Sequence, residues 1–178
     1  MLSTTKTSER RRERSTEQEI RFWMSSPAIL VSRSAPIGEA LRLIREHNVR
    51  RLPVIAEDER ICGIITYGDI RGTQVLRALD LGVKDLADAL ERITVDEVMT
   101  TAPITISPTT TLRDAGRLMV ENKVSGLPVL DDMGSVIGII TESDVFEALA
   151  YCLHQEVLEA WDISKLVVEP QPLDLVTG

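Results

Sequence analysis

Two threonine–aspartate pairs stand out in this chain because their residue types and spacing could do chemistry. Thr66 and Asp69 lie three residues apart, and Thr141 and Asp144 repeat the pair 75 residues later. Each threonine ends an apolar run of strand length, and each aspartate falls in the first turn of a predicted helix. Hydroxyl, carboxylate and the free N–H groups of the helix would then converge. A carboxylate can accept hydrogen bonds from two vicinal hydroxyls and a helix N-terminus attracts phosphate, so each pair suits a ribose that carries a phosphate.

The same four residues also allow a purely structural interpretation. Asp69 and Asp144 could be helix N-cap residues and nothing more, with Thr66 and Thr141 as the ends of their strands. The residue types alone leave both interpretations open.

Both pairs lie in a segment that occurs twice. Residues 24–72 align on residues 99–147 without a gap, with 16 identities in 49 positions. The identical stretches include Leu-Pro-Val at 52–54 and 127–129, and Gly-Ile-Ile-Thr at 63–66 and 138–141. A unit of about 50 residues buries too little apolar surface to be robust alone, so we expect the copies to pack face to face across a pseudo-twofold axis. Any cleft at that seam should therefore occur twice.

Hydrophobic patterning predicts the order strand, helix, strand, strand, helix in each copy. The expected strands cover residues 29–31, 52–55 and 61–65 in the first copy, and 104–106, 127–130 and 136–140 in the second. Their continuous apolar character indicates strands that are covered on both faces. Helices are expected over residues 37–44 and 112–119, and helices of about ten residues after Asp69 and Asp144. Gly134 can supply the positive φ of a hairpin turn.

The chain divides into five predicted parts. Residues 1–19 form a polar arm of interleaved arginine and glutamate that cannot bury a core face. Residues 20–80 form the first motif, 81–95 a linker helix, 96–153 the second motif, and 154–178 a C-terminal helix and tail. A length of 178 residues suffices for one core with tails, and we expect no second, catalytic domain.

Charge and composition exclude several function classes. The net charge of −8 argues against a nucleic-acid partner, but not against a small phosphorylated ligand held by a few local arginines. No apolar run reaches the roughly 20 residues of a membrane helix and no secretory pattern is visible, which predicts a cytoplasmic protein without a membrane partner. Cys62 and Cys152 lack metal-ligand spacing, so no metal site is expected. His47 is better explained as a helix C-cap than as a ligand.

The motifs that recur in register resemble those of the CBS domain pair, or Bateman module, over about residues 20–153. They are Met24 and Met99 before the first strand, Leu-Pro-Val in the middle, and Gly-Ile-Ile-Thr-x-x-Asp at the end. The resemblance implies an α/β (α+β) fold of two tandem βαββα repeats about a pseudo-twofold axis, with small mixed sheets flanked by helices.

The resemblance also implies which residues touch a ligand. In similar modules the aspartate of the Thr-x-x-Asp motif holds ribose hydroxyls, a role that falls here on Asp69 and Asp144. Adenine contacts fall mostly on backbone groups, and side chains beside Leu-Pro-Val face the phosphates. The matching adenine positions are Ile29, Ile104 and the neighbourhood of Val49 or Val124, and the matching phosphate positions are Arg50, Arg51, Lys123, Ser125 and Gly126.

The two copies differ at the phosphate positions. Ser125 and Gly126 stand where the first copy has Arg50 and Arg51, so we expect unequal affinities at the two clefts. Because clefts in this family use residues of both copies, the cleft that Arg50 serves stays open here. Solvent-facing charge at the start of a strand is the alternative for both arginines.

The leading hypothesis is a regulatory, non-catalytic module that senses AMP, ADP or ATP between the repeats and transmits binding to its oligomeric state or to a protein target. The resemblance implies a homodimer through the helices that follow the Thr-x-x-Asp motifs, and no cofactor beyond the adenine nucleotide ligand. A ligand-independent dimerisation or docking module is one alternative, and a sensor of S-adenosylmethionine or Mg²⁺ is another. An enzyme is the least favoured hypothesis, because the sequence shows no nucleophile beside a base, no metal-ligand cluster and no glycine-rich phosphate loop.

Overall fold

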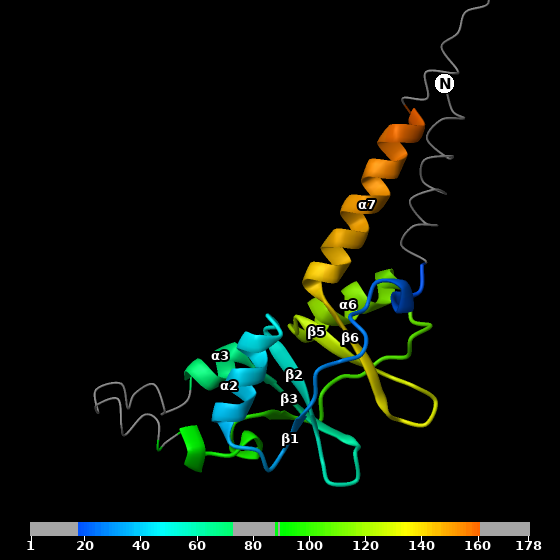
Figure 1. Ribbon diagram of the computed structural model, residues 1–178. Coiled ribbons are helices and arrows are strands. Elements are labelled where there is room, and N and C mark those ends of the chain that lie inside the picture. Colours follow the sequence, from blue (N-terminus) through cyan, green and yellow to red (C-terminus); the bar gives the residue numbers. More distant parts are fainter. Residues whose placement is uncertain (1–17, 73–87, 89, 161–178) are drawn as a thin grey trace, which may run out of the picture.

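The computed structural model describes residues 18–72, 88 and 90–160 of the chain, and two similar halves make up this part (Figure 1). The first half contains η1 (Ile20–Phe22), β1 (Val31–Ser32), α2 (Ile37–Glu46), β2 (Arg51–Ile55), β3 (Ile61–Thr66) and α3 (Tyr67–Gly72). The second contains η3 (Val95–Glu97), β4 (Thr100–Thr101), α6 (Leu112–Asn122), β5 (Gly126–Leu130), β6 (Val136–Thr141) and α7 (Glu142–Ala160). Most of the predicted arm, most of the linker helix and the predicted tail lie outside the described residues.

The strands form two small sheets flanked by helices, as predicted. One sheet has the order β1-β2-β3-β4, in which β1 and β2 are parallel and the other pairs antiparallel, and the other consists of β5 and β6. Gly134, in the turn between β5 and β6, has a φ of 85°, which confirms the positive φ expected there.

The first strand of each copy is shorter than predicted. The strand expected at 29–31 is reduced to Val31–Ser32, and the one expected at 104–106 to a single bridge between Ile106 and Val129. Proline has no N–H to donate to a neighbouring strand. Because Pro53 and Pro128 lie in the middle of the partner strands, β1 pairs only beyond Pro53, at Val54 and Ile55.

Each half begins with a segment that pairs with the other half, and we call residues 20–25 and 95–100 the entry segments. Ser25, at the entry to the first copy, exchanges backbone hydrogen bonds with Ile139 of β6, with N–O distances of 2.9 and 3.0 Å. Thr100, at the equivalent place in the second copy, pairs with Ile64 of β3. The short helices η1 and η3 also contact the opposite half. The N–H of Val95 in η3 donates to the carbonyl of Ala35, and the N–H of Ile20 in η1 donates to the carbonyl of Thr110. The two copies therefore exchange their entry segments.

Two strand glycines leave the room that this crossing needs. A Cβ atom on Gly63 would lie 3.0 Å from Met99 Cγ and 3.1 Å from the carbonyl oxygen of Thr100. A Cβ on Gly138 would lie 2.9 Å from both Met24 Sδ and the carbonyl oxygen of Ser25. The identity of both glycines and both methionines in the two copies thus has a common physical cause.

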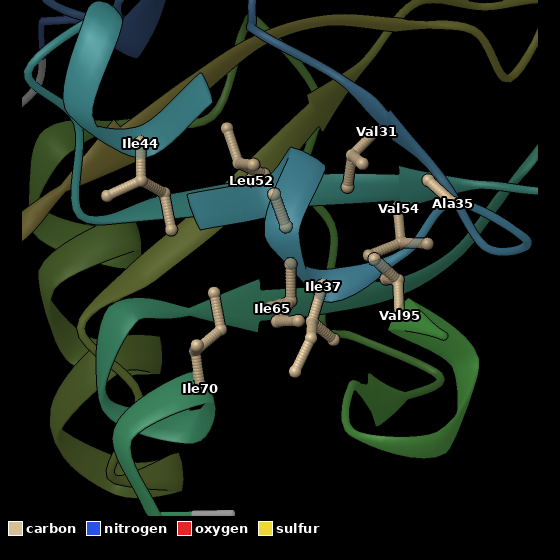
Figure 2. Close-up of a cluster of buried hydrophobic side chains, with 10 residues drawn as sticks. Val31, Ala35, Ile37, Ile44, Leu52, Val54, Ile65, Ile70 and Val95 are labelled. Atoms are coloured by element: carbon tan, nitrogen blue, oxygen red, sulfur yellow. The ribbon is translucent and has the colours of Figure 1, made fainter. Parts of the chain in front are cut away.

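Each half has its own hydrophobic core, and each core includes one fully buried residue from an entry segment. Figure 2 shows the first core, where Ile37 and Ile44 of α2 face Leu52 of β2 and Ile65 of β3. Val95 of η3 is fully buried in this core, and Ile20 of η1 is fully buried in the second one. The apolar side chains of the entry segments therefore stabilise the neighbouring half.

The last helix differs from the prediction. Instead of about ten residues followed by a separate C-terminal helix, α7 has 19 residues and runs through the predicted boundary at 153–154 without a break. It extends well away from the sheets (Figure 1). The ring of Tyr151, halfway along α7, packs edge-on against Trp23 at 5.7 Å between centroids, so the helix contacts the first entry segment there. The predicted domain boundaries remain predictions.

The exchange of entry segments predicts that Ile20→Ala destabilises the whole fold. Ile20 is fully buried in the second core, and truncating such a side chain costs about 2–5 kcal/mol of unfolding free energy. Urea unfolding should show this loss as a lower midpoint. Phe22→Ala is the matched control, because Phe22 is 71% exposed and its removal should change stability by no more than about 0.5 kcal/mol. Equal effects of the two substitutions would contradict the exchange.

Candidate functional site

The two threonine–aspartate pairs form the same hydrogen-bonded structure at the starts of α3 and α7. Asp69 Oδ2 accepts from the backbone N–H of Thr66 at 2.8 Å and from its hydroxyl at 2.7 Å. Asp144 Oδ2 accepts from the N–H and the hydroxyl of Thr141, both at 2.7 Å. In the first pair the N–H of Asp69 also donates to the hydroxyl of Thr66 at 3.1 Å. The first pair is a full capping box, in which the threonine is the N-cap and the aspartate is the third helical residue. The second pair shares the two bonds to its aspartate, and we use the same term for it.

The capping box corrects the structural interpretation of these residues without excluding a binding role. The threonines, not the aspartates, occupy the N-cap position. The hydrogen bonds described above use Oδ2 of each aspartate and leave Oδ1 outside the capping box. A carboxylate that is fixed through one oxygen presents the other in a defined direction, which is what a binding site needs from its side chains. Capping and ligand binding are therefore compatible.

One pocket of about 490 Å³ lies between the two halves. From the first half it is lined by the entry segment, by the loop after α2 and by the start of β2. From the second half it is lined by the end of β6 and the first turn of α7. Of the predicted site residues it brings together Ile29, Val49, Arg50, Arg51 and Thr141. We call it the first pocket.

A more open pocket of about 570 Å³ lies on the other side of the two arginines. It is lined by Thr66 and Gly68 at the start of α3, by Ser125, and by Arg45 near the end of α2. Val49, Arg50 and Arg51 line it as well. We call it the second pocket, and it shares both arginines with the first.

Several predicted site residues line neither of these two pockets. Asp69 and Asp144 stand behind Thr66 and Thr141 through the capping boxes. The others that line neither pocket are Ile104, Lys123, Val124 and Gly126. The duplication therefore does not produce two equal pockets: Val49, Arg50 and Arg51 of the first copy line both, whereas their counterparts Val124 and Gly126 of the second copy line neither.

The prediction missed Arg45, Tyr67 and Asn48, which line the second pocket. Asn48 has a φ of 51° directly after the C-cap residue His47, and the equivalent Lys123 has a φ of 55° after α6. Asparagine after a helical run is typical of this left-handed conformation, so Asn48 could have been recognised as a turn. No comparable signal marks Arg45 or Tyr67. The predicted C-cap role of His47 is confirmed.

Arg51 is the most unusual side chain at the seam. Its Nε atom is buried and has no hydrogen-bond partner among the described residues. Burial lowers the pKa of Arg51 below its ordinary value, while the carboxylates of Glu142 and Asp144 oppose that shift. A buried polar group without a partner is costly, so its persistence calls for an explanation.

Gly126 makes room for Arg51. A Cβ atom on Gly126 would lie 2.8 Å from Arg51 Cδ and 3.1 Å from Cζ, closer than side chains approach one another. Gly126 is the residue that aligns with Arg51 in the duplication. Equivalent residues that touch lie at the pseudo-twofold axis, so one large side chain crosses the axis and its counterpart must be small.

Metal ligands, membrane-spanning helices and reactive thiols are the other features that bear on function. In residues 18–72 and 90–160, no three histidine, cysteine or acidic side chains gather so that they could hold a metal ion. In the same ranges, no helix has both the length and the apolar character that crossing a bilayer requires. Burial raises the pKa of the Cys62 thiol, which keeps it protonated and less reactive.

The capping boxes predict the effect of removing their threonines. Thr66→Ala and Thr141→Ala should each lower the unfolding free energy by about 1 kcal/mol, the usual cost of losing an N-cap side chain. Chemical denaturation would measure it. Ser143→Ala is the control, because Ser143 lies in the same turn as the second capping box but is exposed, and it should change stability by less than about 0.5 kcal/mol. Threonine variants as stable as Ser143→Ala would show that the boxes contribute nothing.

Comparisons with known proteins agree with this geometry. The family model described as CBS domain matches residues 18–75 and 95–151. The uncharacterized protein MJ1426 of Methanocaldococcus jannaschii is 33% identical over 144 residues, which cover 68% of this chain and 85% of that protein. The crystal structure of the CBS-pair protein CBSX2 from Arabidopsis thaliana superposes with a TM-score of 0.65 at 28% identity, covering 78% of this chain and 99% of that one.

Two related structures contain ligands. CBSX2 in complex with AMP superposes with a TM-score of 0.63 at 27% identity, covering 75% of this chain and 97% of that one. The CBS domain pair of protein MJ0100, in complex with 5′-methylthioadenosine and S-adenosyl-L-methionine, superposes with a TM-score of 0.62 at 28% identity and the same coverage. The chain therefore belongs to the CBS domain family, with two CBS domains in tandem.

Proposed function

We propose that this chain is a regulatory module that binds a phosphorylated adenosyl ligand, AMP, ADP or ATP, in the first pocket. The observation that carries the proposal is the buried, unpartnered Nε of Arg51 at the wall of a pocket that also holds Thr141. A phosphate in the pocket would give the Arg51 guanidinium a charged acceptor. The start of α7 would add its free N–H groups and the positive end of its dipole.

The lining of the first pocket fits the parts of a nucleotide. Ile29, Val49 and Pro53 offer apolar surface and backbone groups for an adenine ring. The hydroxyl of Thr141 donates a hydrogen bond to Asp144. Thr141 would contact a ribose that lies between the adenine ring and the two arginines. A volume of about 490 Å³ is within the usual range for small-molecule sites, about 300–1,000 Å³.

The ligands of the related structures support an adenosyl group, and the charge of the first pocket supports a phosphate. CBSX2 is described with AMP, and MJ0100 with 5′-methylthioadenosine and S-adenosyl-L-methionine. S-adenosylmethionine carries a sulfonium cation, which two adjacent arginines disfavour by like-charge repulsion. Arg50 and Arg51 therefore favour an adenine nucleotide over S-adenosylmethionine.

Helix α7 is the element through which binding would reach a partner. Its first turn lines the first pocket, and farther along it Phe146 is 70% exposed. Val120 on α6, which packs against α7, is 80% exposed. Exposed apolar side chains on adjoining helices favour contact with a second copy or with a target protein. We assign the chain no catalytic step: its role is to change how this helical surface associates.

The same exposed side chains favour the second candidate, a docking module that works without a ligand. A thermal melt separates the two candidates, because ligand at 100 times its dissociation constant adds about 2.7 kcal/mol of stability. The proposed function predicts a higher Tm with AMP, ADP or ATP. A Tm unchanged by all three nucleotides would favour the docking module.

Isothermal titration with AMP, ATP and S-adenosylmethionine tests the assignment of the site. Asp144→Ala should weaken nucleotide binding about 10- to 100-fold, because a hydrogen bond to a charged group contributes about 1.5–3 kcal/mol. Asp69→Ala, behind Thr66 of the second pocket, should weaken the tightest binding less. Asp132→Ala is the matched control, since Asp132 lies exposed in the turn between β5 and β6. Unchanged affinity in both Asp69→Ala and Asp144→Ala would rule the site out.

A further inference from the structure

Arg51 lies between the two pockets and lines both of them. We propose that it is a single anion receptor shared by both pockets, so that a phosphorylated ligand in the first pocket weakens phosphate binding in the second. This inference rests on the proposed function and adds a regulatory property to it. The module would respond to nucleotide in two stages rather than filling two independent sites.

The position of Arg51 is fixed by its surroundings. Arg51 is the first residue of β2, and its side chain fills the space over Gly126. Its Nε is buried without a partner, while the guanidinium feels the carboxylates of Glu142 and Asp144 at the start of α7. The guanidinium therefore borders both pockets, and phosphates bound in the two pockets would share its single positive charge.

The second half provides no substitute for Arg51. The residues that align with Arg50 and Arg51 are Ser125 and Gly126, neither of which carries a charge. Arg50 also lines both pockets but is exposed, so solvent screens its charge. Arg45 lines only the second pocket and is exposed as well. In the described part of the chain, Arg51 is thus the only half-buried cation that either of these pockets contains.

Electrostatic repulsion would couple the two pockets. A phosphate on Arg51 neutralises the one half-buried cation and places negative charge beside the second pocket. A second phosphate would then meet a neutralised site and a like charge across a partly buried seam, where screening by water is weaker than in bulk solvent. This loss of affinity applies only to ligands that carry a phosphate. The binding of an uncharged adenosyl ligand such as adenosine in the second pocket should not be weakened in this way.

The duplication supplies a matched pair of reporters for a test. Gly68 and Ser143 are equivalent residues in the first turns of α3 and α7. Gly68 lines only the second pocket and Ser143 only the first. Their backbone amide signals in two-dimensional NMR therefore report the occupancy of each pocket separately. The full chain is titrated with AMP and, in parallel, with adenosine, and the quantity measured is the ratio of the Gly68 midpoint to the Ser143 midpoint.

We expect this ratio to be at least about tenfold larger for AMP than for adenosine, the usual effect of one charge-assisted hydrogen bond. Comparing the two ligands on the same protein cancels any difference in how the pockets hold the base. In Arg51→Ala the AMP and adenosine ratios should become equal. In the control Arg45→Ala the tenfold excess should remain, because Arg45 reaches only one pocket.

The possible failures can be told apart. Equal ratios for AMP and adenosine in the unmodified chain would overturn the shared receptor, as would an excess that survives in Arg51→Ala. A Ser143 signal that responds while Gly68 responds to neither ligand would overturn it too, since no second pocket would exist to compete. If neither reporter responds to either ligand, the proposed function itself falls, and this inference with it.

Discussion

The structure depends on one constraint, the crossing of the two entry segments. Ser25 pairs with β6 and Thr100 pairs with β3, so neither half completes its sheet or its core without the other. The crossing is possible only because Gly63 and Gly138 lack a Cβ where the opposite segment passes. A unit of about 50 residues buries too little apolar surface to fold securely alone, and the exchange removes that limit. It also fixes the distance between the halves, and with it the width of the seam.

A symmetric fold with an asymmetric seam explains the character of the site. The crossing places equivalent residues around a pseudo-twofold axis, where Arg51 meets its own counterpart, Gly126. Two arginines could not both occupy this position, because one side chain already fills the space. Because the two copies differ at this position, the positive charge lies on Arg51 and has no equivalent at Gly126. The first turn of α7 lies at the same seam, so an anion bound there would touch a helix that carries exposed apolar side chains.

Much of the fold could be predicted from local sequence, because it depends on local rules. The strands around Leu-Pro-Val and Gly-Ile-Ile-Thr, and the turn at Gly134, follow from apolar runs and turn chemistry. The capping boxes could also have been read from the Thr-x-x-Asp spacing, with the threonine as N-cap. The continuity of α7 was available too, since residues 142–160 contain no glycine or proline. The crossing could not be predicted in this way, because pairing between segments more than 100 residues apart is set by tertiary packing, as between Ser25 and Ile139.

We propose a specific arrangement of atoms in the first pocket: a phosphate on Arg51, with the ribose beside Thr141 and Asp144. The most direct test is a crystal structure of the protein grown with AMP. The account predicts AMP in the first pocket, its phosphate oxygens within hydrogen-bond distance of the Arg51 guanidinium and its ribose hydroxyls near Asp144 Oδ1. A structure in which AMP lies elsewhere, or lies in this pocket with its phosphate directed away from Arg51, would contradict the account.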